Sequence, residues 1–219
     1  MAKLYVSNKD ESARIFKSDF LEFFSKVHWT VPIIFYVPFI LLFLYLGLYS
    51  YEIGWGESAV VFLAGIVVWS IVEYLLHRFL FHYHPKSEWA KKVHWTFHGV
   101  HHDYPQDSKR LVMPPAVSIP LALLFYLLFN ALFGTAYNMP FFAGFLTGYV
   151  AYDTIHYAIH HFAFKNKIML ALKQHHMKHH YVEPDEGFGV SLPLWDHVFG
   201  TTYTVDKKKT IRQLDNHIK

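Results

Sequence analysis

The histidines of this chain gather in short clusters. There are 17 among 219 residues, and most fall in four places along the chain. Ten of them form a repeated pattern: one i, i+5 pair, two i, i+3, i+4 triplets and one i, i+4 pair. They are His77 and His82; His98, His101 and His102; His156 and His160; and His176, His179 and His180. Since residues at i, i+3 and i+4 share a helix face, each triplet can aim its imidazoles at one point. The spacing predicts a metal site held by helices.

The number of histidines indicates how many ions such a site holds. Because zinc takes about four ligands, two ions sharing ten imidazoles is the natural count. On a regular helix His77 and His82 point about 140° apart, which allows them to serve different ions. Cysteine is absent, so any ligand is a nitrogen or an oxygen atom. Imidazole suits zinc, copper, iron and nickel, so spacing alone does not select the element.

Two carboxylates are placed to support these ligands. A ligating imidazole usually donates its other ring N–H to a carboxylate or a carbonyl. Glu73 lies four residues before His77, and Asp153 lies three residues before His156, so both are candidates for this role. The remaining histidines lie off the pattern: we expect a supporting or structural role for His84, His94, His161 and His175, and none at the metal for His28, His197 and His217.

Long apolar runs indicate that lipid surrounds much of the chain. Hydrophobic residues make up 53% of it and charged residues 17%, and the apolar residues cluster in runs. Residues 29–51 and 111–152 carry no charged side chain, and residues 58–80 carry only Glu73, His77 and Arg78. Since a span needs about 20 residues, the run of residues 111–152 holds two helices, with a turn at residues 134–138. The predicted fold is an all-α integral-membrane bundle of four transmembrane helices with a histidine-rich cytoplasmic cap.

The two ends of the chain have a different character. Residues 1–28 are polar and too acidic for a cleaved signal peptide. Within them an apolar stripe at helical spacing predicts a helix at the membrane interface, and it consists of Phe16, Phe20, Phe23, Phe24 and Val27. Residues 29–219 form the second unit, the membrane domain, whose tail from about residue 165 we expect to fold as the cap.

The distribution of Lys and Arg predicts the topology. Cations precede the first span, occupy the loop between the second and third spans, and return in the tail, whereas the other two turns carry none. Cationic loops face the cytoplasm, so four spans place both termini there, in the inner membrane of a bacterium or the endoplasmic reticulum of a eukaryote. All four clusters then lie at one face. The formal charge of +3 reflects this membrane surface and no basic stripe for nucleic acid.

The chemistry of such a site favours iron. Zinc has no redox chemistry, and a histidine-only site beside acyl chains offers no evident hydrolysable bond. Oxygen activation at a di-iron centre fits best, although zinc could occupy the site without being the catalytic metal. A membrane metal transporter is the alternative of another class. It is disfavoured because residues 111–152 provide no ladder of charged groups across the membrane.

The motifs resemble the fatty acid hydroxylase and sterol desaturase superfamily, and within it the fatty acid 2-hydroxylases. Beside the histidine boxes, the resemblance rests on Arg110-Leu-Val-Met-Pro-Pro115, on Tyr152 to Tyr157, and on Gly187-Phe-Gly-Val190 with Trp195, Asp196 and Phe199 to Thr201. It implies a dimetal centre with all ten box histidines as ligands.

The resemblance also implies the reaction: O2 and two electrons place a hydroxyl group on the carbon beside the carbonyl of a long acyl chain, free or amide-linked as in ceramides. We expect the acyl tail in an apolar channel between helices and the polar head near Lys109 or Arg110. Eukaryotic members carry a b-type cytochrome domain. Residues 1–28 are too short for one, so a separate electron donor is expected. The alternative within the superfamily is a hydroxylase or desaturase of a sterol, carotenoid or other lipid.

Overall fold

The computed structural model describes residues 4–203, and this part of the chain is helical with no β-strand. Residues 204–219, which include His217 and the end of the basic tail, lie outside the described residues. The helices, three of which run on into a π-helical turn, are α1 (Asp19–Phe24), α2 (Val31–Tyr45) with η1 (Leu46–Ser50), α3 (Trp55–Leu75) with η2 (Leu76–Phe81), α4 (Glu88–His94) with η3 (Trp95–Gly99), α5 (Val100–Asp103), α6 (Pro115–His161), α7 (Lys167–Tyr181) and α8 (Leu194–Val198). The prediction of an all-α fold is confirmed for the described range.

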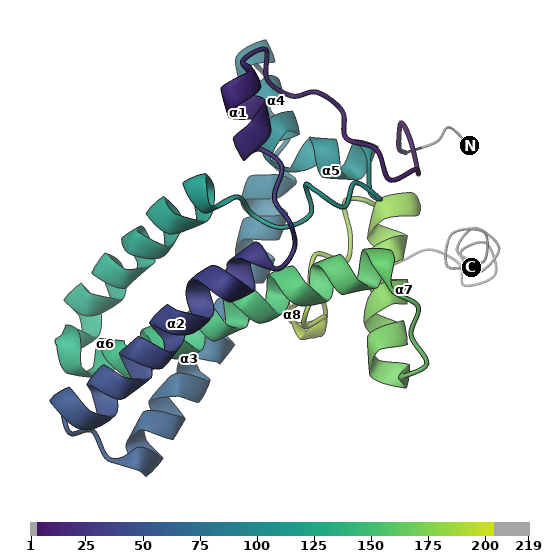
Figure 1. Cartoon of the computed structure of the whole chain (residues 1–219). Coiled ribbons are helices and arrows are strands. Elements are labelled where there is room, and N and C mark those ends of the chain that lie inside the picture. The colour runs from purple at the N-terminus through teal and green to yellow at the C-terminus, as the bar shows by residue number, and fades with distance from the viewer. Residues whose placement is uncertain (1–3, 204–219) are drawn as a thin grey trace.

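Within the described residues, three helices are long and apolar enough to cross a membrane. They are Val31–Ser50, Trp55–Phe81 and Pro115–His161, and the first two agree with the predicted spans to within about three residues. The third is 47 residues long and is broken at Gly134, whose φ of 72° and ψ of 164° are not helical. Figure 1 shows that α6 runs along the bundle and then turns back at this point. Glycine adopts this conformation without the steric penalty that a Cβ would bring.

Close backbone contact joins α3 to the second arm of α6. A Cβ atom added to Gly144 would lie 1.9 Å from the carbonyl oxygen of Phe62, and one added to Gly65 would lie 2.1 Å from that of Phe141. Small residues let transmembrane helices approach closely, so that dispersion contacts replace a hydrophobic driving force that lipid does not supply. Around this contact the aromatic rings of Trp69, Phe145 and Tyr149 pack edge to face. This packing fixes how the ends of α3 and α6, which carry histidines, face one another.

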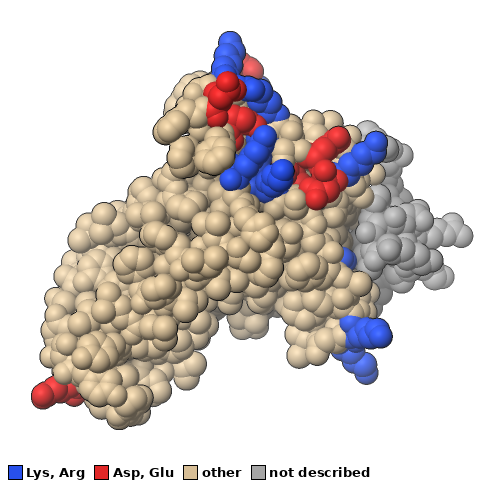
Figure 2. Space-filling model, viewed as in Figure 1, with Lys and Arg blue, Asp and Glu red and all other residues tan. Residues whose placement is uncertain are grey.

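The charged residues gather at one end of the molecule. In the view of Figure 2, Lys, Arg, Asp and Glu lie over the region of α1, α4 and α7, and the bundle is bare of charge except at its far tip. A bundle with an apolar surface and one charged end is the arrangement that a lipid bilayer stabilises.

The N-terminal segment binds residues 103–110 along most of its length. The amides of Val6 and Ser7 donate to the carbonyl of Asp103, and the amide of Val27 donates to that of Lys109 at 2.7 Å. The helix α1 covers only six residues, fewer than the apolar stripe predicts, because Ser18 caps its start and the amide of Val27 donates to Lys109 instead of to a helical carbonyl. On α1 itself, Phe20 and Phe23 are 70% and 73% exposed.

Arg110 anchors this segment. Its side chain is only 3% exposed, and it donates to Glu22 at 2.5 Å and to the carbonyl of Ala13. The expectation that Arg110 holds the polar head of a lipid is therefore wrong, because its guanidinium is already committed within the protein. Lys109, the other candidate, is exposed.

The glycine contact gives a test of the packing. We expect Gly144→Ala to destabilise the folded protein by about 1–3 kcal/mol or more, because the added methyl group forces α3 away from α6. Gly56→Ala is the matched control, since a Cβ there meets nothing within 4 Å. Thermal unfolding of detergent-purified protein measures both. Equal melting temperatures for the two variants would contradict the close packing.

Glu22 gives a second test, with pH as the variable. Burial opposes ionisation of Glu22, but hydrogen bonds from Phe16, Lys26 and Ile15 and the charge of Arg110 outweigh it and lower its pKa from 4.5 to about 2. Because the folded-state pKa is below the unfolded value, the stabilisation is present above pH 4.5 and is lost as the pH falls toward 2. The melting temperature of Glu22→Gln should thus lie below that of the wild type at pH 6, and the gap should narrow by pH 3. A gap independent of pH would contradict this account.

Candidate metal centre

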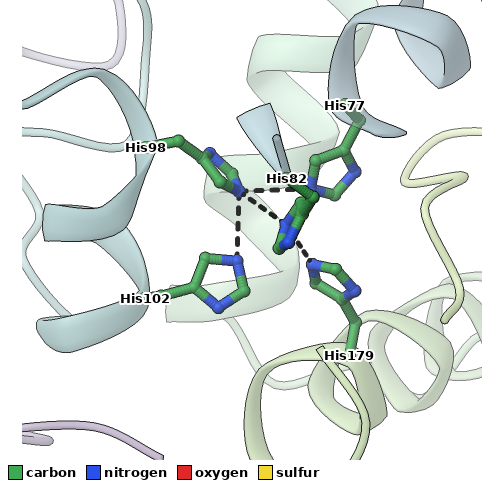
Figure 3. A group of neighbouring side chains, drawn as sticks. All are labelled: His77, His82, His98, His102 and His179. Carbon is green, nitrogen blue, oxygen red and sulfur yellow. Dashed lines mark hydrogen bonds between the residues drawn. The ribbon is translucent and has the colours of Figure 1, made fainter. Parts of the chain in front are cut away.

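The ten patterned histidines meet in two adjoining groups. We call His77, His82, His98, His102 and His179 the first imidazole group. The second imidazole group consists of His101, His156, His160, His176 and His180. Within each group one nitrogen per ring lies within 4.8 Å of all the others. The groups adjoin, since the rings of His102 and His180 stack with their centroids 4.2 Å apart. Figure 3 shows the rings of the first group turned toward a common centre.

A π-helical turn brings His77 and His82 together. The amide of His82 donates to the carbonyl of His77, five residues earlier, at 3.0 Å, and this i→i+5 bond defines the turn η2. Residues five apart then lie on the same side, and the two ring centroids are 4.9 Å apart. The expectation that these two could serve different ions assumed a regular α-helix. It is wrong because the π turn places both rings in the first group.

Each triplet is divided between the two groups. His98 and His102 belong to the first group and His101 to the second, whereas His176 and His180 belong to the second and His179 to the first. The i and i+4 residues remain together, while the i+3 residue points about 100° away from the i+4 residue. The triplets therefore lie between the two groups and contribute to both, instead of each converging on one point.

The contacts between rings fit a cation. The Nε2 atom of His98 lies 3.2, 3.1 and 3.0 Å from the Nε2 atoms of His77, His82 and His102. In the second group, Nε2 of His176 is 2.9 Å from that of His156 and 3.0 Å from those of His160 and His180. A ring nitrogen carries at most one hydrogen, so these contacts cannot all be hydrogen bonds. Lone pairs converge at both places, and a metal ion would satisfy them.

The electrostatics favour neutral rings. Burial, together with the neighbouring imidazoles, holds the pKa values of His98, His101, His176, His179 and His180 well below their usual value. For His102, burial and the nearby His77 and His94 lower the pKa to about 3. Neutral imidazole is the form that ligates metals, so the surroundings keep the lone pairs available.

Two backbone carbonyls fix the outward nitrogens of two rings of the first group. Nδ1 of His77 donates to the carbonyl of Phe188 at 2.5 Å, and Nδ1 of His179 donates to that of Glu186 at 2.8 Å. With the hydrogen on Nδ1, each ring directs the lone pair of Nε2 inward.

The carboxylates take other partners than the sequence suggested. Glu73 accepts from the amides of Val190 and Ser191, so it supports His77 only through the neighbouring loop. Asp153 accepts from the amide of Met113 at 3.4 Å, and its other oxygen is buried without a partner in the described structure. No hydrogen bond found among residues 4–203 joins either carboxylate to a patterned histidine.

Comparison with known proteins gives the family. A family model described as fatty acid hydroxylase matches residues 62–201, which include both imidazole groups. The chain belongs to the fatty acid hydroxylase family.

Relatives with curated names agree. This fatty acid hydroxylase is 38% identical to a dihydroceramide fatty acyl 2-hydroxylase of Arabidopsis thaliana, over 87% of the chain and 80% of that protein. It is 38% identical to the fatty acid 2-hydroxylase of Homo sapiens, over 86% of the chain but 56% of that protein. Among solved structures it resembles full-length scs7p, of which only the hydroxylase domain is visible, with a TM-score of 0.80 and 38% identity over 84% of the chain and 70% of that structure.

The structure also reveals supporting residues that sequence reasoning passed over. Asp196 is fully buried and accepts from His175 at 3.1 Å and from the amides of Phe188 and Gly189. The loop that Asp196 binds contains the Gly-Phe-Gly-Val segment and borders the first group. Both this segment and Asp196 are among the motifs that resemble the 2-hydroxylases, and that was the available signal in the sequence. His84, His94, His161 and His175 lie in neither group.

Metal analysis tests the two groups separately. We expect purified protein to hold two ions per chain, and His98→Ala and His176→Ala to hold about one each, since each change removes the ring that contacts three others. The double variant should hold none, and His197→Ala, at an exposed position, should match the wild type. The measurement is elemental analysis of protein that elutes as one species in gel filtration. Loss of both ions from either single variant would contradict two separable sites.

Proposed function

We propose that this fatty acid hydroxylase is a dimetal monooxygenase that hydroxylates the 2-position of long acyl chains, free or N-linked in sphingolipids of the dihydroceramide type. The observation that carries the proposal is the pair of five-imidazole groups at the charged end of an apolar bundle. The names of the relatives, dihydroceramide fatty acyl 2-hydroxylase and fatty acid 2-hydroxylase, support this substrate class.

The ten patterned histidines are the proposed ligands of two ions, and the all-nitrogen donor set suits iron. Iron would supply the activation of O2, which a redox-inactive ion such as zinc does not. The reaction consumes O2, two electrons and two protons, breaks one C–H bond, forms one C–OH bond and releases water. The electrons come from a separate donor protein. The protein's own part is to hold the acyl carbon beside the imidazole groups and to exclude water.

The position of the site suits a substrate that is apolar at one end and polar at the other. His77 lies in η2, which continues α3, and His156 and His160 lie in the last turns of α6; most other turns of these helices are apolar. An acyl tail lying along these turns would place its carbonyl end at the histidines, where the charged end of the molecule begins. This alignment favours the carbon next to the carbonyl over carbons deep in the chain.

The topology follows from the same arrangement. The two arms of α6 on either side of Gly134 are each long enough for a span, which makes four spans with both termini and the cap on the cytoplasmic side. Residues 1–28 form the interfacial segment, with the exposed aromatic side chains of α1 in the headgroup region. The partners are membrane lipid, O2 and the electron donor, and nucleic acid is not among them.

Lipid analysis tests the function. Expression in a host that lacks 2-hydroxylated lipids should add one oxygen to acyl chains, and fragmentation should place it on C2. His179→Ala should abolish the product because it removes an imidazole of the first group, whereas His197→Ala should not. Loss of two hydrogens, or oxygen on a sterol or carotenoid, would instead show the related lipid hydroxylase or desaturase.

A further inference from the structure

The loop of residues 186–191 borders the first imidazole group. Its carbonyls at Glu186 and Phe188 accept from His179 and His77. The ring of Phe188 also lies against three histidines of this group, with centroid distances of 5.8 Å to His77, 5.4 Å to His82 and 5.7 Å to His179. The loop therefore sets the orientation of the rings through both its main chain and one side chain.

Two buried carboxylates hold this loop from different elements. Asp196, in α8, accepts from the amides of Phe188 at 2.8 Å and Gly189 at 2.9 Å. Glu73, in α3, accepts from the next two amides, those of Val190 at 2.9 Å and Ser191 at 2.8 Å. Four consecutive backbone N–H groups thus donate to two carboxylates, through charge-assisted hydrogen bonds, which are stronger than neutral ones.

The loop has little freedom to move. Asp196 also accepts from the hydroxyl of Thr201 at 2.8 Å, and Glu73 also accepts from that of Ser191. Gly187 has a φ of 70°, and a Cβ on Gly189 would lie 2.6 Å from the carbonyl oxygen of Leu192. A buried carboxylate is costly unless it is fully hydrogen-bonded, so displacing the loop would leave both carboxylates without compensation.

The second imidazole group lacks this support. The Nδ1 atoms of four of its rings are buried and have no hydrogen-bond partner in the part of the chain that the structure describes; they belong to His156, His160, His176 and His180. Their orientation depends on packing between α6 and α7 instead. The loop carbonyls consequently support the first imidazole group and not the second, and the contact of Asp196 nearest to the second group is the hydrogen bond from His175.

We propose that Asp196 and Glu73 are positioning residues for the ion of the first imidazole group alone. They hold the 186–191 loop so that its carbonyls fix the rings of His77 and His179. The ion of the first group then depends on these carboxylates, and the ion of the second group does not. The inference rests on the proposed function, in that it assumes an ion at each group.

Two isosteric substitutions separate hydrogen bonding from charge. In Asp196→Asn one of the two carboxylate oxygens becomes an NH2 group, so in either orientation a donor faces the amide of Phe188 or of Gly189. In Glu73→Gln the remaining oxygen can accept from both Val190 and Ser191, because both amides donate to the same atom, and the new NH2 can donate to the Ser191 hydroxyl. Each change removes one buried negative charge, but only the first leaves a loop amide unsatisfied.

The measurement is the iron content and iron affinity of the full-length protein in detergent, by elemental analysis after equilibration with a graded chelator. We expect Asp196→Asn to bind one of its two ions about 10- to 100-fold more weakly, and Glu73→Gln to keep both. Glu73→Ala, which removes both acceptors, should behave like Asp196→Asn.

Combination with the group variants identifies the ion that is affected. Asp196→Asn combined with His176→Ala, which disables the second group, should lose its remaining ion at the lower chelator concentration. Combined with His98→Ala, it should keep its remaining ion as tightly as His98→Ala does alone. A merely structural role would weaken both ions together, and it would also change the gel-filtration profile.

The outcomes are distinguishable. Wild-type protein that cannot be loaded with two ions would overturn the proposed function itself. Wild-type protein with two ions, together with an Asp196→Asn variant that holds both unchanged, would overturn only the role of the loop. That role would also be overturned if Asp196→Asn weakens the ion of the second group, or if Glu73→Gln weakens an ion as much as Asp196→Asn does.

Discussion

The structure depends on the convergence of neutral imidazoles at two adjoining points. Rings whose Nε2 atoms lie about 3 Å from several others repel one another when their lone pairs point inward, unless a cation lies between them. Everything that brings them together must act against this repulsion until an ion binds. The tight packing of α3 on α6, the hydrogen-bonded N-terminal segment and the clamped 186–191 loop all serve this purpose.

The helices provide this convergence through departures from regular α-helical geometry. A regular α-helix would turn His77 and His82 to different sides, and the π turn η2 returns them to one side by an i→i+5 hydrogen bond between them. The triplet of α7 shows the complementary case, since the regular α-helical spacing of His176, His179 and His180 is kept and directs His179 away from the other two rings. In each triplet, two rings belong to one imidazole group and the third ring belongs to the other. As a result, α5 and α7 each contribute to both imidazole groups.

Sequence reasoning recovered the parts that depend on local pattern. Hydrophobic runs located the long helices, Gly134 marked the reversal within α6, and histidine spacing selected the ten residues that the fold brings together. It could not assign rings to groups, because that depends on a helical register that the π turns change. It also misjudged Arg110, because burial and the partner Glu22, 88 residues away in the chain, are tertiary properties. Glu73 lies near His77 in sequence but has other partners, since the carbonyl of Phe188, more than a hundred residues later, accepts from His77 instead. Asp153 accepts from Met113, and Nδ1 of His156 has no hydrogen-bond partner in the described structure.

The candidate ligands come from the apolar helices and from segments outside them, residues 82–102 and 176–180. Metal binding would therefore be coupled to the folding of these segments. The apolar helices contribute His77, His156 and His160, and the remaining seven come from residues 82–102 and 176–180. Neither part of the chain holds a complete group, since each group draws on both. Binding free energy at such a site is also folding free energy, so an ion in either group would stabilise the contact between the apolar helices and these segments. The N-terminal segment forms backbone and side-chain hydrogen bonds with residues 103–110. These bonds help to hold the residues that follow the histidines of α5 in place. Each imidazole group therefore forms only where the apolar helices meet the other histidine-bearing segments.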